Sequence, residues 1–363
     1  MPDKINVLMC GGRRTGKTSI MSAMQRDMQS LFADGSIILN MMENAGDLAL
    51  YQRKQQRIFS TQNLDKLSYY DEMDATDKET NYPCKITLRG DYQSPIELNF
   101  IDVPGEWFAR PEHEDKIIDR IRQSQILVVA VDSPHLVEED GRFHDVYNRA
   151  TELTTAIIRA FQGSSLYRLI LFVPLKCERY RDNGLRGDKK DMRYLMEAVK
   201  SGYRELFTYL ENSQKSQCTI AIAPCITMGG LEFLQFAAPV DEEGDLVTDE
   251  DGTPLPAVSI NRETGKLDMN WLAEYTYLFN ESGDHYYKPE DCAQPLLRIL
   301  LFFIAMGKLR TQNQDIISRL LGFLRHLPNQ KVLDACKNDL LNKLKTDGSD
   351  GFDVLNDPLG AMK

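Results

Sequence analysis

The chain has 363 residues, of which 42% are hydrophobic and 27% are charged, which is enough for one large domain or two ordinary ones. Its formal net charge of −11 argues against general nucleic-acid binding. The longest apolar run, residues 296–306, contains Arg298 and is too short to span a membrane. Seven scattered cysteines without a CxxC pair are typical of reduced thiols, and the amino terminus carries no signal segment, so we expect a cytoplasmic protein.

The first predicted elements are a strand at residues 5–10 and a helix at 16–31. The sequence GGRRTGKT between them matches the Walker A phosphate-binding loop. In this loop, glycines let backbone N–H groups surround a phosphate, the lysine reaches the terminal phosphates, and the next hydroxyl holds Mg²⁺. We therefore predict a nucleotide phosphate site formed by Gly11, Gly12, Arg13, Arg14, Thr15, Gly16, Lys17, Thr18 and Ser19.

The chain then alternates strands and helices. A polar segment, residues 33–82, is predicted to be a long insertion with a helix at 44–60. Further strands are predicted at residues 84–89, 96–101, 126–132, 168–174 and 219–224, and further helices at residues 112–124, 143–161 and 189–211. This alternation over residues 1–230 is typical of a parallel α/β sheet.

The sequence changes character after residue 230. Turn signals separated by short β-like runs predict a hairpin insertion within residues 231–290. A helix with a strongly apolar face is predicted at residues 295–326. We therefore expect the helices of residues 291–345 to close the domain. The tail, residues 346–363, is rich in Gly, Asp and Ser and is predicted to be disordered.

A second motif follows the strand at residues 96–101, where Asp102-Val103-Pro104-Gly105 precedes Glu106. A carboxylate at a strand end beside a phosphate loop can hold Mg²⁺ through water, and the N–H of the glycine can meet a γ-phosphate. We predict that Thr18 and Asp102 hold Mg²⁺ and that Gly105 contacts the γ-phosphate. An ordinary Asp-Pro-Gly turn is the alternative.

The pair GxxxxGKT and DxxG, on consecutive parts of an α/β pattern, resembles the translation-factor-related, Ras-like class of P-loop GTPases over residues 4–230. Lys176 falls on the lysine of that family's base-reading Asn/Thr-Lys-x-Asp motif, while Leu175 and Glu178 depart from it. Thr227 ends the stretch Ala-Pro-Cys-Ile-Thr, where the family places a loop over the base.

The resemblance implies an α/β fold, namely a P-loop NTPase three-layer sandwich with a mostly parallel sheet, to which the hairpin insertion and a C-terminal helical segment are added. Residues 286–297 also resemble divergent bacterial-type GTPase domains from signalling and defence proteins. A carboxylate accepts hydrogens from guanine N1 and N2, so Glu178 still favours guanine over adenine.

The resemblance also indicates where hydrolysis is supported. Glu106 stands where the family often has a water-orienting glutamine; it can accept a hydrogen bond from water but repels the γ-phosphate, so we expect slow turnover. Either Arg13 or Arg14 reaches across the phosphates, or both point to solvent. Thr80 is the predicted first-switch threonine at Mg²⁺, with Thr76 and Thr61 as alternatives.

Together these motifs predict a cytoplasmic, Mg²⁺-dependent protein that binds GTP and GDP and hydrolyses GTP as a molecular switch. Lys17, Glu106, Thr80 and Arg14 are the predicted catalytic residues. A protein partner is expected to engage the switch regions or the hairpin insertion, with no membrane span. Two alternatives stay open: an ATP-using P-loop enzyme, and a nucleotide-binding scaffold with little or no hydrolysis.

Overall fold

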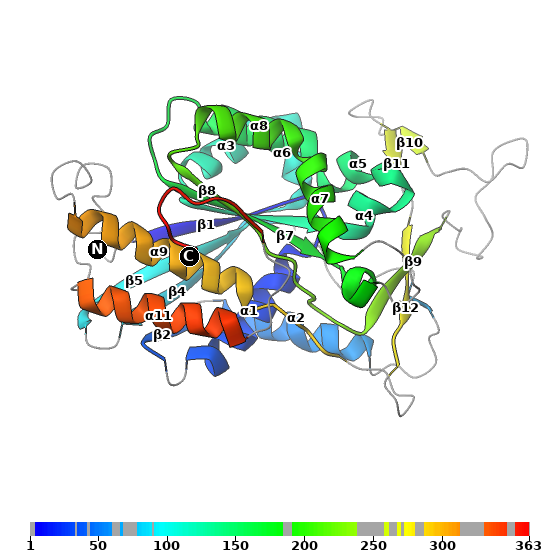
Figure 1. Ribbon diagram of the computed structural model, residues 1–363. Helices are drawn as coiled ribbons and strands as arrows, with labels where there is room; N and C mark the ends of the chain where they lie inside the picture. Colours follow the sequence, from blue (N-terminus) through cyan, green and yellow to red (C-terminus); the bar gives the residue numbers. More distant parts are fainter. Residues whose placement is uncertain are drawn as a thin grey trace, which may run out of the picture.

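The computed structural model describes residues 4–32, 35–41, 44–59, 66–67, 78–88, 91–183, 191–237, 258–260, 267–269, 272–279, 287–312, 330–346 and 353–362. Its centre is an eight-stranded sheet with the order β13-β8-β7-β6-β1-β5-β4-β2 (Figure 1). These strands are β1 (Lys4–Cys10), β2 (Ile37–Met41), β4 (Thr80–Leu88), β5 (Asp91–Asp102), β6 (Ile126–Asp132), β7 (Arg168–Leu175), β8 (Cys218–Ile222) and β13 (Asp353–Asn356).

The middle of this sheet is parallel. Strand β1 pairs in parallel with β5 and β6, β6 with β7, and β7 with β8, whereas β4, β2 and β13 are antiparallel to their neighbours. Every residue of β6 and β7 is buried, as expected for parallel strands covered on both faces. All carboxyl ends of the parallel strands therefore meet at one edge of the sheet.

Helices cover both faces of the sheet. Met9 and Val7 of β1 belong to one apolar core, and Leu8 and Cys10 to the other, because alternate side chains point to opposite faces. The first core is completed by α1 (Lys17–Phe32), α9 (Gln294–Gln312) and α11 (Gln330–Thr346), and the second by α3 (Glu114–Arg122), α6 (Ala150–Phe161), α7 (Met192–Gly202) and α8 (Arg204–Ser213) (Figure 1). This three-layer α/β sandwich confirms the predicted fold class.

Smaller β structures are formed mostly by the chain after β8. Strands β3 (Lys66–Leu67), β12 (Leu272–Tyr277) and β9 (Leu231–Ala237) form a three-stranded sheet, and β10 (Val258–Ile260) pairs with β11 (Leu267–Met269) as an antiparallel hairpin. Phe59, which directly follows α2 (Ala45–Ile58), stacks edge-on against Tyr277 of β12. The hairpin and the C-terminal helices α9 and α11 confirm the two predicted additions to the fold, while the domain boundaries remain predictions.

Two predicted helices are each divided in the structure. The helix predicted at residues 143–161 is α5 (His144–Asn148) followed by α6, because Arg149 adopts a left-handed backbone with φ 54°. The helix predicted at residues 189–211 is divided into α7 and α8 at Tyr203. Shorter elements complete this part: α4 (Ser133–Val137) and the 3-10 helices η1 (Gly105–Phe108), η2 (Pro111–His113), η3 (Glu138–Gly141) and η4 (Glu178–Asn183).

The tail differs from the disorder predicted for residues 346–363. Residues 353–356 form β13, which pairs antiparallel with β8, and Ala361 and Met362 are buried in the first core. Within the described part of the chain, no helix is both long and apolar enough to cross a bilayer.

Candidate functional site

The phosphate loop joins β1 to α1 at the carboxyl edge of the parallel strands. Gly11 and Gly16 have φ values of 136° and 105°, which side-chain-bearing residues rarely adopt. Arg14 is left-handed as well, with φ 63°, and is exposed. The Thr15 hydroxyl donates to the Gly12 carbonyl at 3.1 Å, which closes the turn. The glycine spacing of the motif therefore matches the backbone that the loop needs.

Lys17 is the first residue of α1 and is buried under the loop. Its Nζ donates to the carbonyl oxygens of Gly11 at 3.0 Å and Gly12 at 2.9 Å. Burial lowers the pKa of Lys17, and nearby Asp102 opposes that shift. A buried ammonium group held by backbone carbonyls can exchange those bonds for phosphate oxygens.

Oxygen donors for a divalent cation come together beside Lys17. The Thr18 hydroxyl donates to Asp102 Oδ2 at 2.9 Å, and Asp102 is fully buried at the end of β5. Thr80 begins β4 directly opposite Asp102 in the strand register. Hydroxyl and carboxylate oxygens suit Mg²⁺, so this donor set fits the predicted metal. Thr76 and Thr61 lie outside the described residues.

The segment after Asp102 docks directly on the phosphate loop. A Cβ atom on Gly105 would lie 2.3 Å from both the Gly12 carbonyl carbon and the Arg13 nitrogen. On its other side, a Cβ on Gly12 would lie 1.9 Å from the carbonyl oxygen of Tyr147 in α5. The loop is thus enclosed by η1 and α5 at positions where only glycine fits.

Two arginines flank Glu106. Its Oε1 lies 2.8 Å from an Arg13 guanidinium nitrogen, and its Oε2 lies 3.6 Å from one of Arg110. All three side chains are about half exposed, at 41% for Glu106, 53% for Arg13 and 52% for Arg110. The carboxylate is therefore accessible to water, and each of its oxygens has an arginine beside it.

Helix α1 continues the site with Ser19, whose hydroxyl lies 3.1 Å from that of Tyr51 in α2. The Ser22 hydroxyl donates to the Leu48 carbonyl at 3.0 Å and fixes the same pair of helices. The predicted first-switch insertion is therefore attached to the helix that starts at the phosphate loop.

The predicted base loop follows β7. Leu175, the last residue of β7, is fully buried, and its Cδ1 would lie 2.9 Å from a Cβ on Gly16. Packing of Leu175 therefore links this loop to the phosphate loop. Lys176 has a left-handed backbone with φ 56°, and its Nζ lies 2.5 Å from Asp132 Oδ2.

Asp132 is a site residue that the motif analysis missed. It ends β6, it is buried, and its Oδ1 lies 2.6 Å from His135 Nδ1. Burial would raise the pKa of Asp132, but His135 and Lys176 outweigh it and hold that pKa well below its usual range. Its signal was available: like Asp102, it is a carboxylate at the end of an apolar parallel strand.

Glu178, which begins η4, contacts the loop after β8 that contains Thr227. Glu178 is only 6% exposed, and its Oε1 accepts a hydrogen bond from the Gly229 N–H at 3.1 Å. Burial raises the pKa of Glu178 although this bond favours the carboxylate. Thr227 is buried two residues before Gly229. Their predicted base contacts remain predictions.

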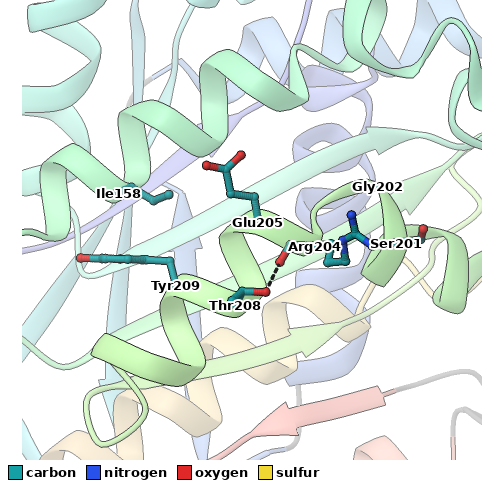
Figure 2. A pocket seen from close by; sticks show the side chains of 7 residues that line it. All are labelled: Ile158, Ser201, Gly202, Arg204, Glu205, Thr208 and Tyr209. Carbon is teal, nitrogen blue, oxygen red and sulfur yellow. Dashed lines mark hydrogen bonds between the residues drawn. The ribbon is translucent and has the colours of Figure 1, made fainter.

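A separate cavity lies on the helical face of the molecule. Its volume is about 650 Å³. Figure 2 shows the residues that line it, which come from α6 to α8: Ile158, Ser201, Gly202, Arg204, Glu205, Thr208 and Tyr209. Within it, the Thr208 hydroxyl donates to the Arg204 carbonyl at 2.8 Å. It contains none of the predicted site residues, so the phosphate loop and its neighbours form the candidate site.

No protein-family model matches the chain, and no curated protein matches it. Among solved structures, it is similar to a chain of the signal recognition particle receptor SRb-GTP/SRX complex from Chaetomium thermophilum, with 13% identity over 62% of this chain and 91% of that chain and a TM-score of 0.35.

Two structures of the S. cerevisiae Ski7 GTPase-like domain are also similar. The GTP-bound one shares 14% identity over 62% of this chain and 43% of that chain, with a TM-score of 0.38. The one bound to GDP and inorganic phosphate shares 13% identity over 70% and 48%, with a TM-score of 0.39. The chain thus spans less than half the length of the Ski7 chains.

Proposed function

We propose that this chain is a Mg²⁺-dependent GTPase that binds GTP and GDP, hydrolyses GTP slowly and acts as a molecular switch. The observation that carries the proposal is the convergence of Lys17, Thr18, Asp102 and Gly105 on one phosphate loop. These residues come from two separate motifs, and each has the chemistry that its position in a nucleotide site requires.

Each residue has a distinct role in this proposal. The loop N–H groups and Lys17 bind the phosphates, while Thr18 directly and Asp102 through water would hold Mg²⁺. The ion, when bound, neutralises charge that develops on the phosphates during hydrolysis. Gly105 presents its N–H to the γ-phosphate, and Thr80 adds a hydroxyl from the facing strand.

Switching would use the two segments that contact the phosphate loop. Gly105 touches Gly12 and Arg13, so a γ-phosphate arriving at the loop must be accommodated by η1. Thr80 joins the first-switch insertion to β4, opposite Asp102. We place the contact with a protein partner at these switch regions or at the hairpin insertion.

One observation favours the ATP-using alternative. Glu178, the predicted guanine reader, is buried and accepts a hydrogen bond from the Gly229 N–H. If that hydrogen bond persists when nucleotide is bound, the Glu178 carboxylate is less available to guanine N1 and N2. The preference of the site for GTP over ATP is then smaller. Base selectivity therefore has to be measured together with binding.

The proposal is tested by titrating the purified full-length chain with labelled GTP and labelled ATP, in Mg²⁺ and in EDTA, and by measuring phosphate release. We expect Mg²⁺-dependent binding that favours GTP and slow release of phosphate. Lys17→Ala should lose roughly ten- to a hundredfold in affinity, because it removes charged hydrogen bonds worth about 1.5–3 kcal/mol. Lys215→Ala, in the exposed turn between α8 and β8, is the control.

Two results would contradict parts of the proposal. Equal affinity for both nucleotides, or a preference for ATP, would overturn the guanine assignment. Tight binding of GTP without phosphate release would contradict the hydrolytic function and indicate a nucleotide-binding scaffold.

A further inference from the structure

The carboxylate of Glu106 lies between two arginines, Arg13 and Arg110. A carboxylate beside a γ-phosphate is repelled by it, which is the physical reason to expect poor catalysis from glutamate at this position. Here one arginine lies next to each carboxylate oxygen, Arg13 at 2.8 Å and Arg110 at 3.6 Å. The three side chains together carry a charge of +1, so the group as a whole attracts the phosphate.

The two arginines also fix where the carboxylate lies. Arg13 belongs to the phosphate loop, and its backbone nitrogen would lie 2.3 Å from a Cβ on Gly105, the residue before Glu106. Arg110 lies four residues after Glu106, beyond the end of η1. Arg13 is therefore held next to Glu106 by the contact between Gly105 and the phosphate loop, and Arg110 lies in the same short segment as Glu106.

The group remains open to water. A carboxylate has about four acceptor positions, so two arginine contacts leave room for a further hydrogen bond. Exposed ion pairs like these contribute little to stability, which leaves orientation as their main effect. Of the elements packed against η1, α3 places the Lys116 Nζ 3.6 Å from the Trp107 ring centroid, and η2 places the His113 ring centroid 5.1 Å from that of Trp107.

We propose that Arg13 and Arg110 are positioning residues that hold the Glu106 carboxylate oriented as the acceptor for the attacking water. This inference rests on the proposed GTPase function. The water oxygen forms a bond to the γ-phosphorus as the bond to the β,γ-bridging oxygen breaks, and that electron pair stays on GDP. The proton released by the water passes to the phosphate product.

The test is single-turnover GTP hydrolysis by the full-length chain, measured together with GTP affinity. We expect Arg13→Ala to lower the rate roughly tenfold, which corresponds to the loss of about one hydrogen bond between the attacking water and a charged group. In a Glu106→Gln background the same change should matter less than about threefold, because its target carboxylate is gone. Arg122→Ala, on the exposed end of α3, is the control.

A substitution that keeps the charge separates positioning from a merely structural role. With Glu106 present, Arg13→Lys should restore the single-turnover rate toward the wild-type value, and Arg110→Lys should do the same relative to Arg110→Ala. In the Glu106→Gln background, neither lysine should change the rate by more than about threefold.

The outcomes are distinguishable. Equal losses from Arg13→Ala in both backgrounds, or no recovery of the rate in Arg13→Lys, would overturn the inference and leave the GTPase proposal standing. A wild-type chain that binds no GTP, or binds it without hydrolysis, would overturn the inference together with the hydrolytic function.

Discussion

His144 makes the stability of the protein depend on pH. It is buried in α5, with its Nδ1 3.0 Å from the Asn148 amide nitrogen, and burial lowers its pKa to about 4. An unfolded histidine has a pKa of about 6.5, so the unfolded chain takes up the proton first as pH falls. The stabilisation is complete above pH 6.5 and decreases down to about pH 4, by up to about 3 kcal/mol.

This dependence is measured by urea unfolding at a series of pH values between 7 and 4. His144→Gln should flatten the decrease, while His113→Gln, a partly exposed histidine in η2, should leave it unchanged. The same slope in all three proteins would show that another group is responsible.

A substitution at Gly105 tests the contact between η1 and the phosphate loop. Gly105→Ala places a methyl group 2.3 Å from backbone atoms of Gly12 and Arg13, so either the loop or η1 must move. We expect affinity for GTP to fall roughly tenfold, corresponding to the loss of about one hydrogen bond to a charged group, with a smaller fall for GDP. Gly46→Ala is the matched control, because nothing lies within 4 Å of its added Cβ.

At the scale of single residues, the motifs predicted site residues that are adjacent in the sequence. They did not predict contacts between residues that belong to different elements. The loop around Lys17 could be recognised because its glycines and lysine are adjacent in sequence. The partner of Lys176 is Asp132, 44 residues earlier, and the partner of Glu178 is Gly229, 51 residues later. Neither contact has a local signal, because both arise from neighbouring strands of the sheet.

Among the elements, β13 is fastened to β8 by the side chain of Asn356 as well as by strand pairing. The Asn356 amide donates to the carbonyls of Lys215 at 2.7 Å and Cys218 at 2.6 Å, which fastens the strand beside β8. Asn356→Ala should lower the free energy of unfolding by about 1–2 kcal/mol, measured by urea denaturation. Asn212→Ala, on the exposed face of α8, should change it by less than about 0.5 kcal/mol.

Element types were easier to predict than their ends. The strand at residues 126–132 was predicted at its observed limits because it is apolar throughout and ends at a carboxylate. The division of the helix at residues 143–161 was missed, because apolar periodicity continues across it. There the Asp145 carboxylate accepts a hydrogen bond from the Thr151 N–H at 2.8 Å and starts α6 anew.

At the scale of the whole molecule, the sheet order places β1, carrying the phosphate loop, between β5 and β6. A ligand bound there contacts both halves of the sandwich and should stabilise the folded chain as a whole. With GTP and Mg²⁺ at 100 times the dissociation constant, we expect about 2.7 kcal/mol of added stability. Thermal unfolding should therefore shift upward in the wild type and show little shift in Lys17→Ala.

The central claim, a guanine-nucleotide site at the phosphate loop, is tested most directly by identifying the nucleotide that co-purifies with the full-length chain, by chromatography after denaturation. The account predicts GDP or GTP in the wild-type protein and a strongly reduced amount in Lys17→Ala. An adenine nucleotide, or guanine nucleotide retained equally by Lys17→Ala, would contradict it, as would a nucleotide-free protein that takes up no added GTP.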